Sequence, residues 1–248
     1  MKKLMVVLLS ALMVFSFAAC SGGSSETYVI ATDTTFAPFE FQNEKGEYVG
    51  IDIELLAAIA EDQGFKYELK TLGFDAAVQA LEAGQADGVI AGMSITDERK
   101  KSFDFSEPYF DSGVVMGIAK DNNDIKSYAD LKGKKVAVKT GTEGSAFAES
   151  IKAKYGFKTV YFKDSSMMYE DVKAGNSVAC FEDYPVLGYA VTQNVGLKIV
   201  TEKEQGSSYG FAVQKGKNEE LLKKFNDGLK NLKDNGKYQE ILDKYIQE

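Results

Sequence analysis

The chain contains no histidine and no tryptophan, and it has only 2 cysteines and 3 prolines in 248 residues. Histidine is the most common general base near neutral pH and the most common metal ligand. Its absence excludes serine–histidine triads, histidine-containing cysteine proteases and the zinc-binding histidine motifs. Two cysteines can build neither a disulfide framework nor a cysteine-rich zinc site. We therefore expect no metal and no cofactor.

Arginine is nearly absent, since Arg99 is the single arginine against 28 lysines. Acidic residues outnumber basic ones, which gives a formal net charge of −8. An acidic chain would repel the phosphates of a nucleic acid, so we expect no nucleic-acid partner. The 44% of hydrophobic residues is typical of a globular protein and excludes a disordered chain.

The N-terminus has the pattern of an export signal. Lys2 and Lys3 precede an apolar run over residues 4–17, which is shorter than a membrane-spanning helix requires. Small residues then lead to Cys20 and a Gly/Ser-rich stretch, as in a bacterial lipobox. We expect a lipoprotein signal peptide over residues 1–19, then lipidated Cys20 and a tether over residues 20–26. The alternative is an ordinary secretory signal cleaved after Ala19.

Strand-like and helix-like segments alternate after the tether. Helical spacing of apolar residues predicts helices over residues 52–63, 75–83, 96–101, 167–174 and 185–193. Strands are expected over residues 66–70, 135–139, 177–181 and 208–213. This alternation is typical of an α/β fold with mainly parallel sheets, in which ligands bind at the carboxyl ends of strands. The polar residues expected there are Asp33, Gly92, Ser94, residues 140–144, Glu182 and Asp183.

Several motifs resemble one protein family over residues 27–248. They are TDTTFAPFEF at residues 32–41, GMSITDERK at 92–100, DFSEPY at 104–109, DLKGKKVAV at 130–138, YGFAV at 209–213 and NGKY at 235–238. Together they resemble the polar amino-acid solute-binding proteins of ABC importers, with glutamine binders the most similar.

The resemblance implies a two-lobed fold of the type II periplasmic-binding-protein class, with a two-strand hinge. One lobe would comprise residues 27–111 plus 208–248, and the other residues 112–207. The lobes would close on a free amino acid and deliver it to the permease subunits of an importer. We expect a monomer that is exported and held by its lipid to the outer face of the cell membrane.

A free amino acid needs a cation for its carboxylate and an anion for its ammonium group. Arg99 suits the first role, because a planar guanidinium binds a carboxylate through two hydrogen bonds. Asp183 suits the second role. The resemblance adds donors at Ser94 and Thr142, the Gly92 carbonyl as an acceptor, and the rings of Phe36 and Phe74 on either side of the ligand.

Asp33, Lys139 and Glu182 are left to select the ligand side chain. An amide needs both a donor and an acceptor, which these residues supply. A glutamate ligand would be repelled by the two carboxylates, and an arginine or lysine ligand would face Lys139. We therefore expect glutamine. Glu182 leaves a cationic ligand open, and glutamate, arginine, lysine and cystine are the alternatives.

Two other classes of function compete with a binding protein. Some dehydratases share this fold, but catalysis needs an acid or base on the substrate, and without histidine the choice is small. A sensor domain of a kinase or channel would carry an output domain, and we expect none. The sequence therefore predicts a binding protein rather than an enzyme.

Overall fold

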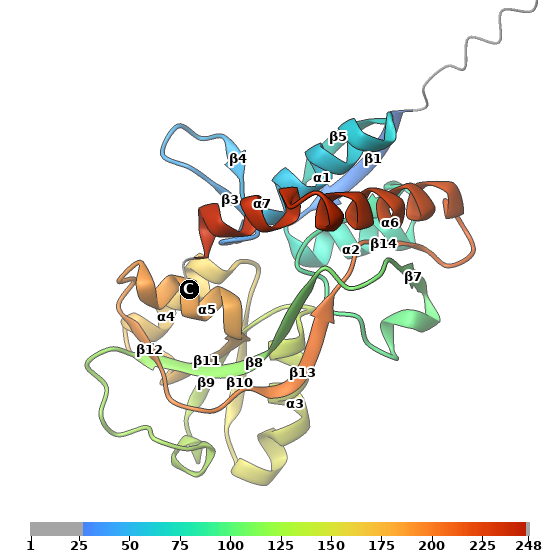
Figure 1. The fold of residues 1–248 in the computed structure, drawn as a ribbon. Coiled ribbons are helices and arrows are strands. Elements are labelled where there is room, and N and C mark those ends of the chain that lie inside the picture. Colours follow the sequence, from blue (N-terminus) through green and yellow to red (C-terminus); the bar gives the residue numbers. More distant parts are fainter. Residues whose placement is uncertain (1–26, 247–248) are drawn as a thin grey trace, which may run out of the picture.

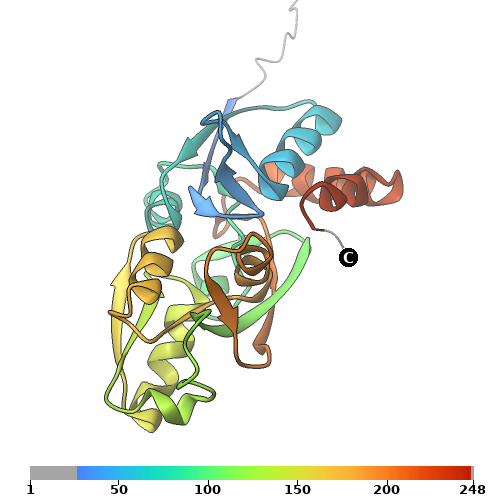
Figure 2. The same ribbon diagram turned by 90° about the vertical axis from the view of Figure 1, so that its left-hand side faces the viewer.

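The computed structural model describes residues 27–246. The expected signal peptide over residues 1–19, and Cys20 with the tether over residues 20–26, lie outside the described residues. Within the described range, no helix has the length and hydropathy needed to cross a bilayer. The chain forms two lobes, each built on its own sheet, as two perpendicular views show (Figure 1 and Figure 2).

The first lobe contains both ends of the described chain. Its main sheet consists of β1 (Thr27–Thr32), β5 (Lys66–Thr71), β6 (Gly88–Val89), β7 (Phe103–Phe105) and β14 (Ala212–Gln214). Its helices are α1 (Ile51–Gln63), α2 (Phe74–Glu82), the 3-10 helix η1 (Arg99–Lys101), α6 (Glu219–Asp234) and α7 (Lys237–Tyr245). The strand order is β5-β1-β6-β14-β7, with β1 parallel to its neighbours and β14 antiparallel to its own.

A small antiparallel sheet lies between β1 and α1 in the sequence. It consists of β2 (Thr35–Phe36), β3 (Glu40–Gln42) and β4 (Tyr48–Val49).

The second lobe is built on a larger sheet. Its strands are β8 (Phe110–Ala119), β9 (Lys135–Lys139), β10 (Lys158–Phe162), β11 (Ala179–Asp183), β12 (Leu197–Ile199) and β13 (Glu204–Tyr209). Its helices are the 3-10 helix η2 (Tyr128–Leu131), α3 (Glu143–Tyr155), α4 (Ser165–Lys173) and α5 (Tyr184–Thr192). The order is β10-β9-β11-β8-β12, and β13 also pairs with β8.

Two antiparallel strands, β8 and β13, connect the lobes (Figure 1). Phe110 pairs with Tyr209 where both strands reach the first lobe, and Tyr109 N–H donates to the Tyr209 carbonyl (2.9 Å). The expected two-lobed α/β fold is thus confirmed. The sheets are more mixed than expected, because β8 and β14 run antiparallel to the strands that the helices connect.

Each lobe has its own core, and helix packing in the first lobe depends on one glycine. α1 buries Ile59 against α6, where a Cβ on Gly228 would lie 2.8 Å from the Ile59 side chain. Nearby, the rings of Phe211 and Phe225 stack with centroids 4.4 Å apart and fix α6 on the sheet. Burying one such ring stabilises the fold by about 1.5–3 kcal/mol.

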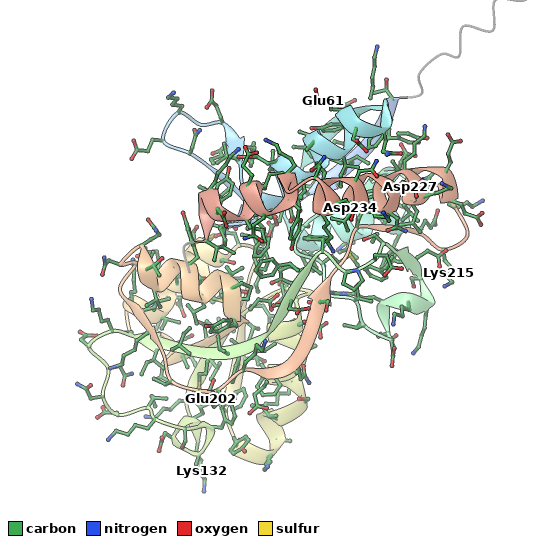
Figure 3. All side chains as sticks on the ribbon, in the orientation of Figure 1. Glu61, Lys132, Glu202, Lys215, Asp227 and Asp234 are labelled. Carbon is green, nitrogen blue, oxygen red and sulfur yellow. The ribbon has the colours of Figure 1, made fainter. Side chains whose placement is uncertain are left out.

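Charged side chains cover the outside of both lobes. The six charged residues labelled in Figure 3 are all exposed: Glu61, Lys132, Glu202, Lys215, Asp227 and Asp234. The buried charged side chains are Asp33, Glu40, Asp52, Lys139, Glu182 and Asp183.

Candidate ligand-binding site

A small pocket lies between the two lobes. It is lined by Phe36, Phe74, Gly92, Ser94, Arg99, Thr142, Glu143 and Asp183. The first five belong to the first lobe and the last three to the second. The structure therefore brings together seven of the ten residues predicted to bind the ligand.

Arg99 lies between the lobes and is bonded to both. Its Nη1 donates to the Ser94 carbonyl (2.8 Å), and its Nη2 donates to the Gly141 carbonyl of the second lobe (3.0 Å). The guanidinium carbon lies 5.2 Å from the centre of the Phe74 ring. Burial lowers the pKa of Arg99, although the Glu143 carboxylate 3.9 Å away opposes this. The site thus holds a positive charge with its plane fixed.

The N-terminus of α3 faces the same pocket. Thr142 is its N-cap, and its hydroxyl accepts a hydrogen bond from Ser145 N–H (3.3 Å) and donates one to the Lys139 carbonyl (2.8 Å). A Cβ on Gly144 would lie 2.6 Å from the Phe181 carbonyl oxygen, so glycine lets α3 approach β11.

Glu143 lines the pocket and falls within the predicted stretch of residues 140–144, but the sequence reasoning assigned it no role in binding. Acidic residues are common in the first turn of a helix because they favour the positive end of its dipole. Because this explanation accounts for an acidic residue at this position, it gives no reason to expect Glu143 in the pocket lining. Its position next to Thr142 at a strand-to-helix junction is the signal that would have indicated it.

Asp183 ends β11 and begins α5, and its side chain is held by a tyrosine. Its Oδ2 accepts a hydrogen bond from the Tyr209 hydroxyl (2.6 Å), which itself accepts one from Ser112 (3.0 Å). Burial, followed by the neighbouring Glu182, raises the pKa of Asp183 to about 7. A nearby cation would favour the ionised form. The sequence places Tyr209 only within a motif, so its contact with Asp183 was also missed.

Two phenylalanine rings border the pocket as predicted. Phe36 lies between Gly92 and Lys139, with the Lys139 ammonium 4.8 Å from the ring centre. Gly92 has a φ of +52°, and a Cβ there would lie 2.3 Å from the Phe36 ring. Only glycine allows this close approach. Phe74 begins α2, where the guanidinium of Arg99 covers its ring.

The remaining three predicted residues form a buried polar cluster beside the lining. Lys139 makes an ion pair with Asp33 across the two lobes and a 3.4 Å hydrogen bond to the Ser165 hydroxyl. Ser165 donates in turn to Glu182 (2.8 Å). Burial alone would lower the pKa of Lys139, but the carboxylates of Asp33 and Glu182 outweigh it and raise that pKa. Burial raises the pKa of Glu182.

A larger groove of about 820 Å³ opens to solvent elsewhere between the lobes. It is lined mainly by residues of α5, the start of β8 and the end of α7, including Phe110, Tyr184, Tyr189, Lys203 and Tyr245. None of the ten predicted residues lines it. The smaller pocket is therefore the candidate site, because oppositely charged groups converge there.

Comparison with known proteins agrees with this geometry. Residues 28–248 match the bacterial extracellular solute-binding proteins, family 3. The chain is 31% identical to the arginine-binding extracellular protein ArtP of Bacillus subtilis, covering 99% of this chain and 98% of that protein. An ancestral arginine-binding protein bound to glutamine is 43% identical with a TM-score of 0.82, covering 90% of this chain and 98% of that one.

The solved structures also differ in how well the relative arrangement of their lobes matches that of this protein. Substrate-binding domain 2 of Lactococcus lactis GlnP, in an open conformation, is 42% identical but has a TM-score of only 0.62, covering 91% of this chain and 97% of that one. At nearly equal identity, this structure matches the ligand-bound protein better than the open one. The chain belongs to the bacterial extracellular solute-binding proteins of family 3, and it is an amino-acid-binding protein of an ABC transporter rather than an enzyme.

Proposed function

We propose that this protein captures glutamine between its lobes and delivers it to an ABC importer. The observation that carries the proposal is the pairing of opposite charges in one small pocket. Arg99 comes from the first lobe and Asp183 from the second, and both line the same pocket. A zwitterion that contacts both groups would join the lobes.

The backbone part of the ligand has a partner for each charge. Two N–H groups of Arg99 donate to the Ser94 and Gly141 carbonyls, and its other N–H groups can donate to a ligand carboxylate. The Ser94 hydroxyl adds a donor beside it, whereas the Thr142 hydroxyl already donates to the Lys139 carbonyl. Asp183 receives the ammonium group together with the Gly92 carbonyl. Because Asp183 is buried and costly to ionise alone, a bound ammonium would stabilise its charge.

The aliphatic part of the ligand would lie between Phe36 and Phe74. Its polar end would meet the cluster of Asp33, Lys139 and Glu182 beside the pocket. Lys139 is already paired with Asp33, so a neutral amide can accept from the remaining ammonium hydrogen without adding charge. A glutamate side chain would add a carboxylate beside two others, which is unfavourable in a buried site.

A cationic amino acid is the second candidate. Glu143 adds a carboxylate to the pocket lining, and a relative at 31% identity is described as arginine-binding. The ancestral arginine-binding protein was also obtained with glutamine bound, so one scaffold of this family accepts both ligands. Glutamate, lysine and cystine are the further ligands against which glutamine has to be compared.

Calorimetric titration with the twenty common amino acids, and with cystine as well, tests the proposal. We expect glutamine to bind most tightly. Glu182→Gln should weaken arginine about tenfold, since a charge-assisted contact is lost, and should weaken glutamine less than about threefold. Equal losses for both ligands would show that Glu182 does not select the side chain. The absence of binding by any amino acid would reject the function.

We also propose that the protein works as an exported monomer anchored through a lipid on Cys20. The support is the sequence alone: an apolar run, small residues, the cysteine and a flexible stretch. Cys20→Ser should release the protein from membranes and leave its affinity for glutamine unchanged, because Cys20 precedes both lobes. If the variant still enters the detergent phase on phase separation, the lipid-anchor proposal is wrong.

A further inference from the structure

Two buried carboxyl groups lie beneath the pocket and have no role in the proposed binding of the ligand. Glu40 comes from β3 and Asp52 from the first turn of α1, and both side chains are fully buried. Asp52 Oδ2 accepts hydrogen bonds from Gly92 N–H (2.7 Å) and from the Tyr109 hydroxyl (2.8 Å). Asp52 therefore holds the backbone of a glycine that lines the pocket.

The other oxygens of this pair lack donors. Among the described residues, no donor lies within hydrogen-bonding distance of either Glu40 carboxyl oxygen or of Asp52 Oδ1. A buried acceptor without a partner is costly, and a buried charge without one is more so. One added proton reduces this cost, because a protonated Glu40 becomes a donor to Asp52 and only its second oxygen is left without a donor.

The surrounding charges favour a single proton rather than two ionised groups. The charged groups that face Glu40 are Asp52, Asp33 and Lys139, and Lys139 is already paired with Asp33. Burial and then the Asp52 charge raise the pKa of Glu40 well above its ordinary value. Burial raises the pKa of Asp52 to about 6, since hydrogen bonds from Gly92 and Tyr109 limit the change. Asp52 already accepts two hydrogen bonds and Glu40 accepts none among the described residues, so the charge belongs on Asp52 and the proton on Glu40.

We propose that Glu40 and Asp52 share one proton, and that this acid–carboxylate pair positions Gly92 in the ligand pocket. The inference rests on the proposed function only for what Gly92 does there, which is to accept from the ligand ammonium. Gly92 has little freedom, because its φ is +52° and Phe36 packs against its Cα. A shift of Asp52 therefore moves both an acceptor and a wall of the pocket.

The Glu40–Asp52 pair makes the stability of the folded protein depend on pH. Both pKa values are higher in the folded protein than in the unfolded chain, so the pair stabilises the fold at low pH. This stabilisation is lost as pH rises through the folded pKa values. Loss of the proton would leave two adjacent buried carboxylates. Tyr109 cannot replace the lost proton by giving up its own, because burial and then the Asp52 charge raise its pKa well above its ordinary value.

Infrared difference spectroscopy at pH 7 tests the shared proton without any ligand. The parent protein should show the carbonyl stretch of buried, neutral carboxylic acids, and Glu40→Gln should weaken that band, the rest of which comes from Asp183 with its pKa of about 7. Glu44→Gln is the matched control, because Glu44 is an exposed glutamate in the loop after β3 and its loss should leave the band in place. If the parent and Glu40→Gln spectra do not differ there, the shared proton is rejected.

Calorimetry with glutamine tests the positioning role. Glu40→Met keeps a similar volume but removes the donor to Asp52, and it should weaken binding about tenfold. Glu40→Gln restores a donor and should recover most of that loss. Equal losses in both variants, with melts showing intact folds, would reject positioning through the hydrogen bond. If the parent does not bind glutamine, the proposed function fails, while the infrared result still decides whether the proton is shared.

Discussion

Arg99 is oriented by carbonyl oxygens rather than by a close carboxylate. Its two hydrogen bonds run to Ser94 and Gly141, and the nearest described carboxylate oxygen paired with it, on Glu143, is 3.9 Å away. Neutral carbonyls fix the plane of the guanidinium without neutralising it. A ligand carboxylate would therefore meet a full positive charge in a fixed orientation.

Arg99→Lys should lose nearly as much affinity for glutamine as Arg99→Ala. Lysine keeps the charge, but its ammonium cannot form two parallel hydrogen bonds in one plane. Leaving a carboxylate partly unpaired in a closed site costs about 2–5 kcal/mol, or roughly 30-fold to several-thousand-fold in affinity. Calorimetric titration measures this loss. Affinity within about threefold of the parent would show that Arg99 supplies charge alone.

A thermal melt is the control for this variant. Arg99 lies in a three-residue 3-10 helix outside the hydrophobic cores, so both substitutions should leave the fold intact and lower the melting temperature only slightly, through the lost hydrogen bonds to Ser94 and Gly141. A large fall in melting temperature would mean that the loss of affinity reflects the fold.

Single residues differ in how far the sequence predicts their roles. Arg99 is identifiable because it is the one arginine in a lysine-rich chain. The ion pair between Asp33 and Lys139 joins residues 106 positions apart, and no local pattern contains it. The buried contact between Asp183 and Tyr209 is hidden for the same reason, since these residues come from different strands.

At the level of elements, the longer helices follow from their apolar periodicity. The spacing predicts a helix over residues 52–63, and α1 runs from Ile51 to Gln63, ending at Gly64 with a φ of +65°. The helix expected over residues 96–101 is wrong in extent, because only Arg99–Lys101 forms a 3-10 turn. The Thr96 hydroxyl does accept from Arg99 N–H (3.2 Å), but no apolar face holds a longer helix there.

The strand expected over residues 208–213 is divided in the structure. β13 ends at Tyr209 in the sheet of the second lobe, and β14 begins at Ala212 in that of the first. Between them a Cβ on Gly210 would lie 2.9 Å from the Ile95 side chain, so the chain passes closely over the first lobe. Alternation of residues cannot show that one run of strand changes sheets, because both halves have the same period.

The short sheet of β2, β3 and β4 was also not predicted. Its strands are only two or three residues long, which is too short for a periodic pattern. Two of them nonetheless supply functional candidates, since β2 carries Phe36 and β3 carries Glu40. Small elements without sequence periodicity thus hold part of the site.

On the scale of the whole molecule, the lobes touch through polar contacts around the pocket. Arg99 bonds Gly141, Asp33 pairs with Lys139, and Ser165 N–H donates to the Thr35 hydroxyl (3.3 Å). A ligand that prefers this arrangement shifts the protein toward it only through contacts that exist when the lobes are closed. The pocket provides such contacts, because its positive and negative groups come from different lobes.

Glutamine should therefore compact the protein in solution. The ammonium and carboxylate groups of one small molecule are too close together to reach Asp183 and Arg99 unless the lobes approach, and β8 and β13 are the strands that must bend. Small-angle X-ray scattering should show a smaller radius of gyration with saturating glutamine than without it. Arg99→Ala is the control, and its profile should not respond to glutamine. Identical profiles for the parent protein in both conditions would show that binding does not require closure.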